Sequence, residues 1–106
     1  MAQLKEQSVT IFNYVKEHDG EDFTCKDIAK DIFGDEGAWR KVSGTVLSFQ
    51  RRKDAEGNET PVMYREKAQI QDEDGKYKDV TFIRLTDYGK EATVESLNAE
   101  DAKKNA

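Results

Sequence analysis

The sequence predicts an α+β fold: a three-helix bundle, then a β-hairpin and a C-terminal helix. Three observations carry this prediction. Before residue 53, apolar residues recur at helical spacing in three successive stretches, whereas residues 62–85 alternate in polarity around an Asp-Gly pair. A threonine-aspartate pair then offers a helix cap at residues 86–87. At 106 residues, a single domain is expected.

The first two expected helices are short and separated by a polar turn. The first runs from Leu4 to about Glu17, and its apolar face comprises Leu4, Ile11, Phe12 and Val15. Residues 19–22 end it with a glycine among acidic side chains. Thr24 then begins a second helix, with Asp27 placed to complete a capping box and Gly34 placed to end the helix. Its buried stripe would be Ile28, Ala29, Ile32 and Phe33.

The third expected helix, residues 38–52, divides into an apolar and a basic face. At 100° per residue the apolar face is narrow, and it is formed by Trp39, Val42, Val46 and Phe49. Trp39 and Phe49 are therefore predicted to be core anchors. The opposite face carries small and basic residues, namely Arg40, Lys41, Gly44, Ser48 and Arg51, with Thr45 and Arg52 at its edge.

A hairpin and a last helix follow. Residues 62–71 alternate as a strand does, and Asp74-Gly75 is a strong turn signal. Residues 80–85 form the return strand, whose imperfect alternation leaves the register open. Thr86 or Asp87 would cap a final helix through Tyr88 and Ala92 toward Leu97. The domain is then expected to span residues 1–97, and residues 98–106 to form a polar tail.

Composition narrows the function classes. Cys25 and His18 are the only residues of their types, so no intramolecular disulfide and no Cys/His metal quartet is expected, and a histidine-based catalytic triad would rest on His18 alone. We interpret His18 as part of a helix end and Cys25 as a packing residue. No phosphate-cradling glycine loop or isolated carboxylate pair is evident. We therefore expect no enzyme, no cofactor and no metal. The absence of a long apolar run or signal peptide predicts a cytoplasmic protein that does not enter a membrane.

The charge of the chain is unevenly distributed. The formal net charge is −5, which by itself argues weakly against a nucleic-acid partner. Residues 35–53, however, hold five basic and two acidic side chains, and no acid lies between Arg40 and Lys53. Each of the segments 1–34, 54–78 and 79–106 is net acidic. The positive charge is thus concentrated on the third expected helix.

The element order resembles that of the winged helix-turn-helix fold. Within it, the string Ile83-Arg84-Leu85-Thr86-Asp87-Tyr88-Gly89-Lys90-Glu91-Ala92 is similar to the strand-to-helix junction of MarR-type and related regulators. In that family a Leu-Thr pair is followed by glycine three residues after the threonine. The similarity covers roughly residues 4–97. The hairpin tip departs from the family's basic wing, since residues 72–79 hold four acids and two lysines.

The resemblance implies a DNA-binding transcriptional regulator of a prokaryote or phage, which docks its third helix in the major groove of double-stranded DNA and is possibly a homodimer. Base contacts are expected at the start of that helix and phosphate contacts at its end. Contacts from the second helix are expected at its start, and the wing contacts are left open because the adjacent acids repel phosphate. The candidate DNA-binding residues are Arg40, Lys41, Gly44, Thr45, Ser48, Arg51, Arg52, Lys53, Thr24, Lys26, Lys76 and Lys78. The alternative is a winged-helix module that binds a protein partner through its acidic surface and does not contact DNA.

Overall fold

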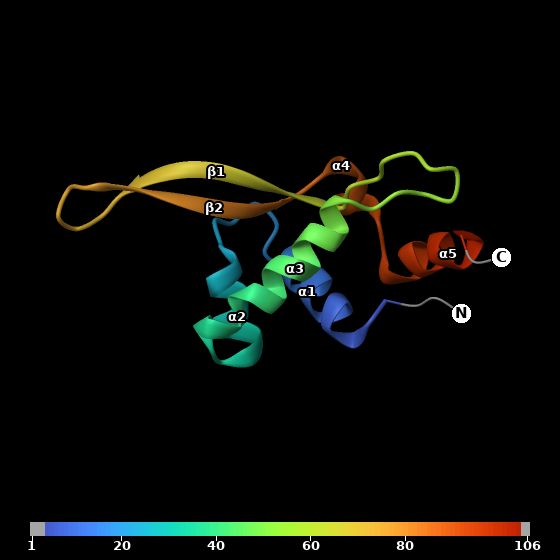
Figure 1. Ribbon diagram of the computed structural model, residues 1–106, viewed down its shortest axis with the longest axis horizontal. Coiled ribbons are helices and arrows are strands. Elements are labelled where there is room, and N and C mark those ends of the chain that lie inside the picture. Colours follow the sequence, from blue (N-terminus) through green and yellow to red (C-terminus); the bar gives the residue numbers. More distant parts are fainter. Residues whose placement is uncertain (1–3, 105–106) are drawn as a thin grey trace.

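The computed structural model describes residues 4–104 and has an α+β architecture, five α-helices and one two-stranded antiparallel sheet being present in that range. In chain order the elements are α1 (Glu6–Glu17), α2 (Cys25–Phe33), the 3₁₀ turn η1 (Glu36–Ala38), α3 (Trp39–Gln50), β1 (Met63–Gln71), β2 (Tyr77–Leu85), α4 (Asp87–Glu91) and α5 (Val94–Lys104). Helices and hairpin therefore follow one another in the predicted order (Figure 1).

The predicted signals at both ends of α2 are confirmed. The Thr24 hydroxyl accepts a hydrogen bond from the Asp27 amide at 3.3 Å, and the Asp27 carboxylate accepts one from the Thr24 amide at 2.9 Å. This reciprocal pair satisfies two amides at the start of the helix. At the other end Gly34 adopts a left-handed conformation with φ 68°, which glycine tolerates better than residues with a Cβ. Local chemistry thus sets the length of α2.

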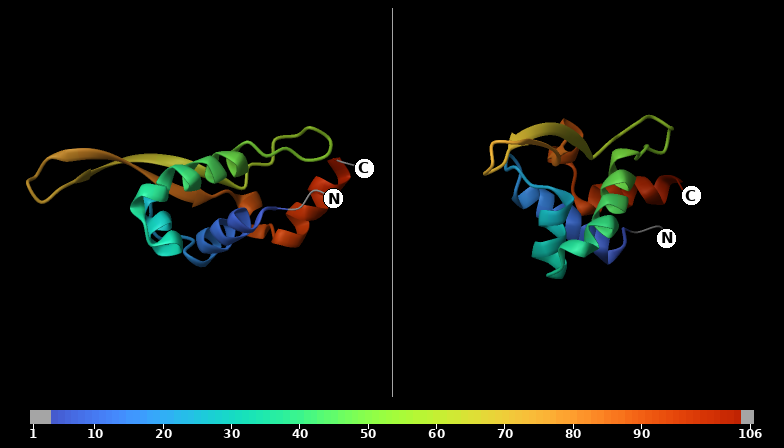
Figure 2. Two further views of the ribbon diagram at one scale, coloured as in Figure 1. Left: turned by 60° about the horizontal axis from the view of Figure 1, so that its bottom comes forward. Right: turned by 60° about the vertical axis from the view of Figure 1, so that its left-hand side comes forward.

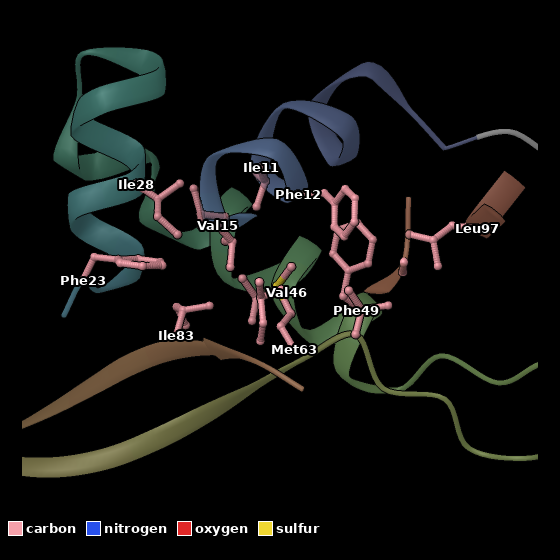
Figure 3. Close-up of a cluster of buried hydrophobic side chains, with 14 of the residues drawn as sticks. Ile11, Phe12, Val15, Phe23, Ile28, Val46, Phe49, Met63, Ile83 and Leu97 are labelled. Atoms are coloured by element: carbon pink, nitrogen blue, oxygen red, sulfur yellow. The ribbon is translucent and has the colours of Figure 1, made fainter. Parts of the chain in front are cut away.

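The core lies where the three helices meet the base of the hairpin. Ile11, Phe12 and Val15 of α1 pack with Ile28, Val42, Val46, Phe49, Met63 and Ile83, and each is at most 3% exposed (Figure 3). Phe49 is a core anchor as predicted. Trp39 is not: it is 37% exposed at the first residue of α3, where Val42 of the same turn enters the core and the Trp39 side chain does not. The aromatic ring lies beside Arg40 instead.

The hairpin is longer than predicted and projects away from the helices. β2 begins at Tyr77, three residues earlier than expected, and pairs in register from Gln71↔Tyr77 to Met63↔Leu85. Gly75 takes φ 80° in the turn. The helices lie under the base of the hairpin and leave its tip free (Figures 1 and 2), so the molecule measures 55 × 27 × 20 Å. The tip of the hairpin therefore projects from the domain as an arm.

The end of the chain differs most from the prediction. The expected single last helix is two helices, because α4 ends at Glu91 and α5 begins at Val94 after a new cap, in which Thr93 and Ser96 exchange side-chain-to-amide hydrogen bonds. Residues 98–104 are helical and not a tail; the rest of the predicted tail, 105–106, lies outside the described residues. Leu97 is fully buried, and the Leu4 amide donates to the Asn98 side chain, so α5 closes the domain beside the start of α1.

Candidate functional site

The outward face of α3 carries the residues that the sequence singled out. Val42, Val46 and Phe49 are turned into the core, which leaves Arg40, Lys41, Gly44, Ser48 and Arg51 exposed on the other side of the helix. We call Arg40, Gly44, Ser48 and Arg51, with Lys41 at the side, the outward face of α3. Because this face packs against no other helix or strand, it is free to contact a partner.

The cations of this region are not neutralised by the protein. Within residues 4–104, Arg40, Lys41, Arg51 and Lys53 form no ion pair with a carboxylate. The Arg40 guanidinium lies 5.5 Å from the centroid of the Trp39 ring, a contact that holds the side chain without cancelling its charge. The outward face therefore presents uncompensated positive charge.

Gly44 stands in the middle of this face without a reason inside the fold. A Cβ placed on Gly44 would meet no atom within 4 Å outside its own helix, and its backbone is ordinary helix. Glycine in a helix interior costs about 1 kcal/mol relative to alanine. Gly89 is the opposite case, since a Cβ there would lie 1.8 Å from the Val62 carbonyl oxygen. Gly44 gives the outward face of α3 a low centre that a partner can approach closely.

The prediction that Arg52 contacts phosphate is wrong, because its side chain is engaged inside the protein. Its guanidinium binds Asp101 at 2.8 Å and donates to the Leu97 carbonyl at 3.1 Å, and its side chain is only 10% exposed. Helix α3 ends at Gln50, so Arg52 already lies in the following loop and turns back toward α5. Arg52 therefore joins α5 to the rest of the domain and is withdrawn from the set of free cations.

Both threonines among the candidate DNA-binding residues are also engaged inside the protein. The Thr45 hydroxyl accepts a hydrogen bond from the Gln7 side chain at 3.3 Å, which turns it toward α1. Thr24 caps α2. Lys26, in the first turn of α2, is exposed. The structure thus keeps Lys26 available, whereas the hydroxyls of Thr24 and Thr45 already have structural partners.

The hairpin brings basic residues that the sequence analysis did not select. Arg65 and Lys67 share the face of the hairpin that carries the buried residues Met63 and Ile83, so they lie on the side of the helices. The charge of Arg65 reaches Cys25 at the start of α2: burial raises the pKa of the Cys25 thiol, and Arg65 opposes that rise. The alternation of β1 already placed Arg65 and Lys67 on one side, and this signal would have identified them.

The predicted wing residues Lys76 and Lys78 are both exposed, but they point differently. Lys76 lies in the turn, where its amide donates to the Asp72 carboxylate at 2.9 Å. Lys78 pairs with Ile70 on the hairpin face turned away from the helices. The two lysines therefore do not form one basic surface with Arg65 and Lys67.

No family model matches this chain, and no curated protein or solved structure is similar enough to count as a relative. Residues 4–104 contain no group of histidine, cysteine, aspartate and glutamate side chains suited to a metal ion. No helix in the described part of the chain is long and apolar enough to cross a membrane. The function is therefore inferred from the surfaces themselves.

A second surface is acidic and lies at the C-terminal end of α1. A hollow of about 350 Å³ between α1, the loop after it and α2 is lined by Tyr14, His18, Phe23, Lys30 and the carboxylates of Glu21, Asp22, Asp27 and Asp31. His18 Nδ1 lies 2.6 Å from the Glu21 carboxylate, and its ring lies 4.2 Å from that of Tyr14. Burial and a hydrogen bond to Asp31 raise the pKa of Tyr14, so the tyrosine stays neutral. His18 thus belongs to the helix end, as the sequence indicated.

Proposed function

We propose that this protein is a winged-helix DNA-binding transcriptional regulator that inserts the outward face of α3 into the major groove of double-stranded DNA. The observation that carries the proposal is the composition of that face: exposed cations without an ion pair in the described part of the chain surround a glycine that the fold does not require. Such a surface suits a polyanion that must approach the helix backbone closely.

The local connections support a winged-helix layout. The Ile83 amide donates to the Phe23 carbonyl at 3.0 Å, so the chain between α1 and α2 passes beside β2. At the junction after β2, Thr86 caps α4 through the Gly89 amide, and its own amide donates to the Val62 carbonyl. Each residue of the Leu-Thr-x-x-Gly string thereby has a structural task, because Leu85 is also buried in the core. The string supports the layout and says nothing about the ligand.

The positions along α3 suggest separate roles for its residues. Arg40 and Lys41 lie in the first turn, from which a helix in the major groove reaches base edges. Arg51 and Lys53 lie at and beyond the other end, where contacts to phosphate are the natural role. Lys26 of α2 and two cations of the inner hairpin face, Arg65 and Lys67, would contact the DNA phosphates on either side of the groove that α3 enters.

Binding to DNA is best tested with sites selected from a random duplex library, followed by titration at several salt concentrations. We expect Arg40→Ala and Arg51→Ala to weaken binding, and Arg51→Ala to lower the slope of log affinity against log salt by about one, the value for one lost phosphate contact. Gly44→Met should abolish tight binding while leaving the fold intact, since nothing inside the protein is near this position.

Lys90→Ala is the matched control, because Lys90 is an exposed cation on α4 and does not belong to the outward face of α3. It removes the same charge and should change the affinity much less than Arg51→Ala. The proposal is wrong if no duplex is enriched at low salt, or if all three substitutions at the outward face bind as the wild type does.

A second candidate function, recognition of a basic protein partner, is favoured by the acidic hollow. Four carboxylates there lie beside the partly exposed rings of Tyr14 and His18, an arrangement that suits a lysine or arginine side chain. A pull-down from nuclease-treated extract separates the two functions. A partner retained after nuclease and lost with Asp27→Asn together with Asp31→Asn supports the protein-binding function, whereas Arg51→Ala should not affect it.

A further inference from the structure

Trp39 lies at the first residue of α3 and is only partly taken up by the core. Its side chain is 37% exposed, whereas Val42, Val46 and Phe49 of the same helix are at most 3% exposed. Large aromatic side chains are enriched at binding surfaces relative to the rest of a protein surface. Trp39 is therefore a candidate for a role outside the core.

The ring of Trp39 holds the side chain of Arg40. The Arg40 guanidinium lies over this ring, 5.5 Å from its centroid. Glu36 lies four residues before Arg40, but no ion pair joins the two, and no other carboxylate of residues 4–104 pairs with Arg40. The guanidinium thus takes an aromatic partner, although an acidic residue is close in the sequence.

This contact orders Arg40 without using its hydrogen-bond donors. A guanidinium is planar and carries its N–H groups at its edge, so a ring that faces the plane leaves those groups free. In the described part of the chain, none of the Arg40 donors binds another protein group. A side chain that is already ordered loses less conformational entropy on binding, so more of the contact energy contributes to affinity.

Arg40 differs in this respect from the other cations of the outward face. Among residues 4–104, neither Lys41 nor Arg51 lies over an aromatic ring. A mobile cation suits a phosphate, whereas an ordered guanidinium suits the two fixed acceptors of a base edge. Arg40 also lies in the first turn of α3, from which a helix in the major groove reaches the bases.

We propose that Trp39 is a positioning residue for Arg40, and that Arg40 held in this way reads a guanine in the DNA site. Guanine presents two acceptors, O6 and N7, in the major groove, and one arginine can bind both. Trp39 acts through Arg40 and does not itself contact the base. This inference rests on the proposed DNA-binding function and adds to it one base and the two residues that select it.

The contact between the two side chains is tested first in the free protein. Trp39 is the only tryptophan of the chain, so tryptophan fluorescence reports on this ring alone. Arg40→Ala should uncover the ring and increase its quenching by acrylamide, a neutral quencher that does not respond to the lost charge. Lys41→Ala is the matched control, because it removes a cation of the same turn that does not lie over the ring, and its quenching should equal that of the wild type. Equal quenching of Arg40→Ala and the wild type overturns the inference before any DNA is added.

Base selection is then measured with a duplex taken from the random library and with versions of it in which each G·C pair in turn becomes A·T. For the wild type, one such replacement should weaken binding by about tenfold or more, and Arg40→Ala should lose this preference. Trp39→Ala should lower the same preference by about fivefold and leave the preferences at other positions unchanged. Trp39→Phe keeps a ring under the guanidinium and should retain most of the preference.

A double variant separates positioning from a direct contact of Trp39 with DNA. In an Arg40→Ala background, Trp39→Ala should cause no further change in base preference, because no guanidinium is left to position. A further loss in the double variant overturns the positioning role, and so does an unchanged preference in Trp39→Ala, while both results leave DNA binding itself intact. If no duplex is enriched, the proposed function fails and this inference fails with it.

Discussion

Arg51 and Arg52 are neighbours in the sequence, but they belong to different regions of the molecule. Arg51 is exposed at the end of α3 and has no ion pair with any carboxylate of residues 4–104, whereas Arg52 is nearly buried and binds Asp101 of α5. Two glycines, Gly44 and Gly89, differ between the same two regions. Gly44 lies on the outward face of α3 in open space, and Gly89 lies against the Val62 carbonyl. We call the second region, formed by Arg52, Val62, Thr86, Gly89 and Asp101, the closing junction.

The difference between the regions separates what the fold needs from what it leaves free. In the closing junction each special residue has a partner at contact distance, so its chemistry is explained by stability. On the outward face of α3 the basic residues and the glycine have no such partner among residues 4–104. A residue that lowers the stability of the fold, or adds nothing to it, is a candidate for contact with a binding partner.

Gly89→Ala should give the largest effect on stability. The added Cβ would lie 1.8 Å from the Val62 oxygen, and this oxygen belongs to the backbone and already accepts the Thr86 amide. No side-chain rotation relieves the contact, so the strand and α4 must separate. We expect a loss of about 3 kcal/mol or more in the free energy of unfolding, measured by urea denaturation.

Protease sensitivity at residues 86–93 would show that the damage is local to the junction. If Gly89→Ala unfolded at the same urea concentration as the wild type, the close approach of α4 to Val62 would be wrong. The proposed layout would then lose the contact that explains the Leu-Thr-x-x-Gly string.

The sequence was most informative where the determining contacts are local. The order of the elements, the Thr24 cap and the turns at Gly34 and Gly75 follow from signals within a few residues. The candidate face of α3 could also be predicted, because the helical period alone separates Arg40 and Arg51 from Val42 and Val46.

The sequence did not predict contacts between residues that are far apart along the chain. The ion pair between Arg52 and Asp101 spans 49 residues, and no local pattern distinguishes Arg52 from Arg51. The same holds for α5, whose polar composition resembled a tail until the cap at Thr93 and the burial of Leu97 gave it a structural role. The alternation of β1 residues between two faces was predicted correctly, but this periodicity does not indicate which of the two faces packs against the core.

Arg52→Met should give the next largest effect and tests the ion pair. The change leaves the mostly buried Asp101 carboxylate and the Leu97 carbonyl without their guanidinium donor, so we expect a loss of about 2 kcal/mol. Amide hydrogen exchange should show the opening of α5 before the rest of the domain. Arg51→Met is the matched control, and it should change stability by about 0.5 kcal/mol or less.

Equal losses for the two arginine variants would contradict the division between the regions. A further variant makes the test quantitative: combining Arg52→Met with Asp101→Leu replaces the pair by apolar side chains and should recover part of the lost stability. If the double variant is as unstable as the sum of the single changes, the two side chains do not interact in solution.

Gly44→Ala should give the smallest effect, and its sign is the informative part. Because a Cβ at Gly44 meets only open space and the backbone is already helical, alanine should raise the free energy of unfolding by about 1 kcal/mol. The same substitution is thus destabilising in the closing junction and stabilising on the outward face of α3. A loss of stability in urea denaturation would mean that the fold itself uses Gly44, and the main reason for assigning this face to a partner would disappear. A gain accompanied by weaker DNA binding would locate the requirement for glycine at the DNA surface.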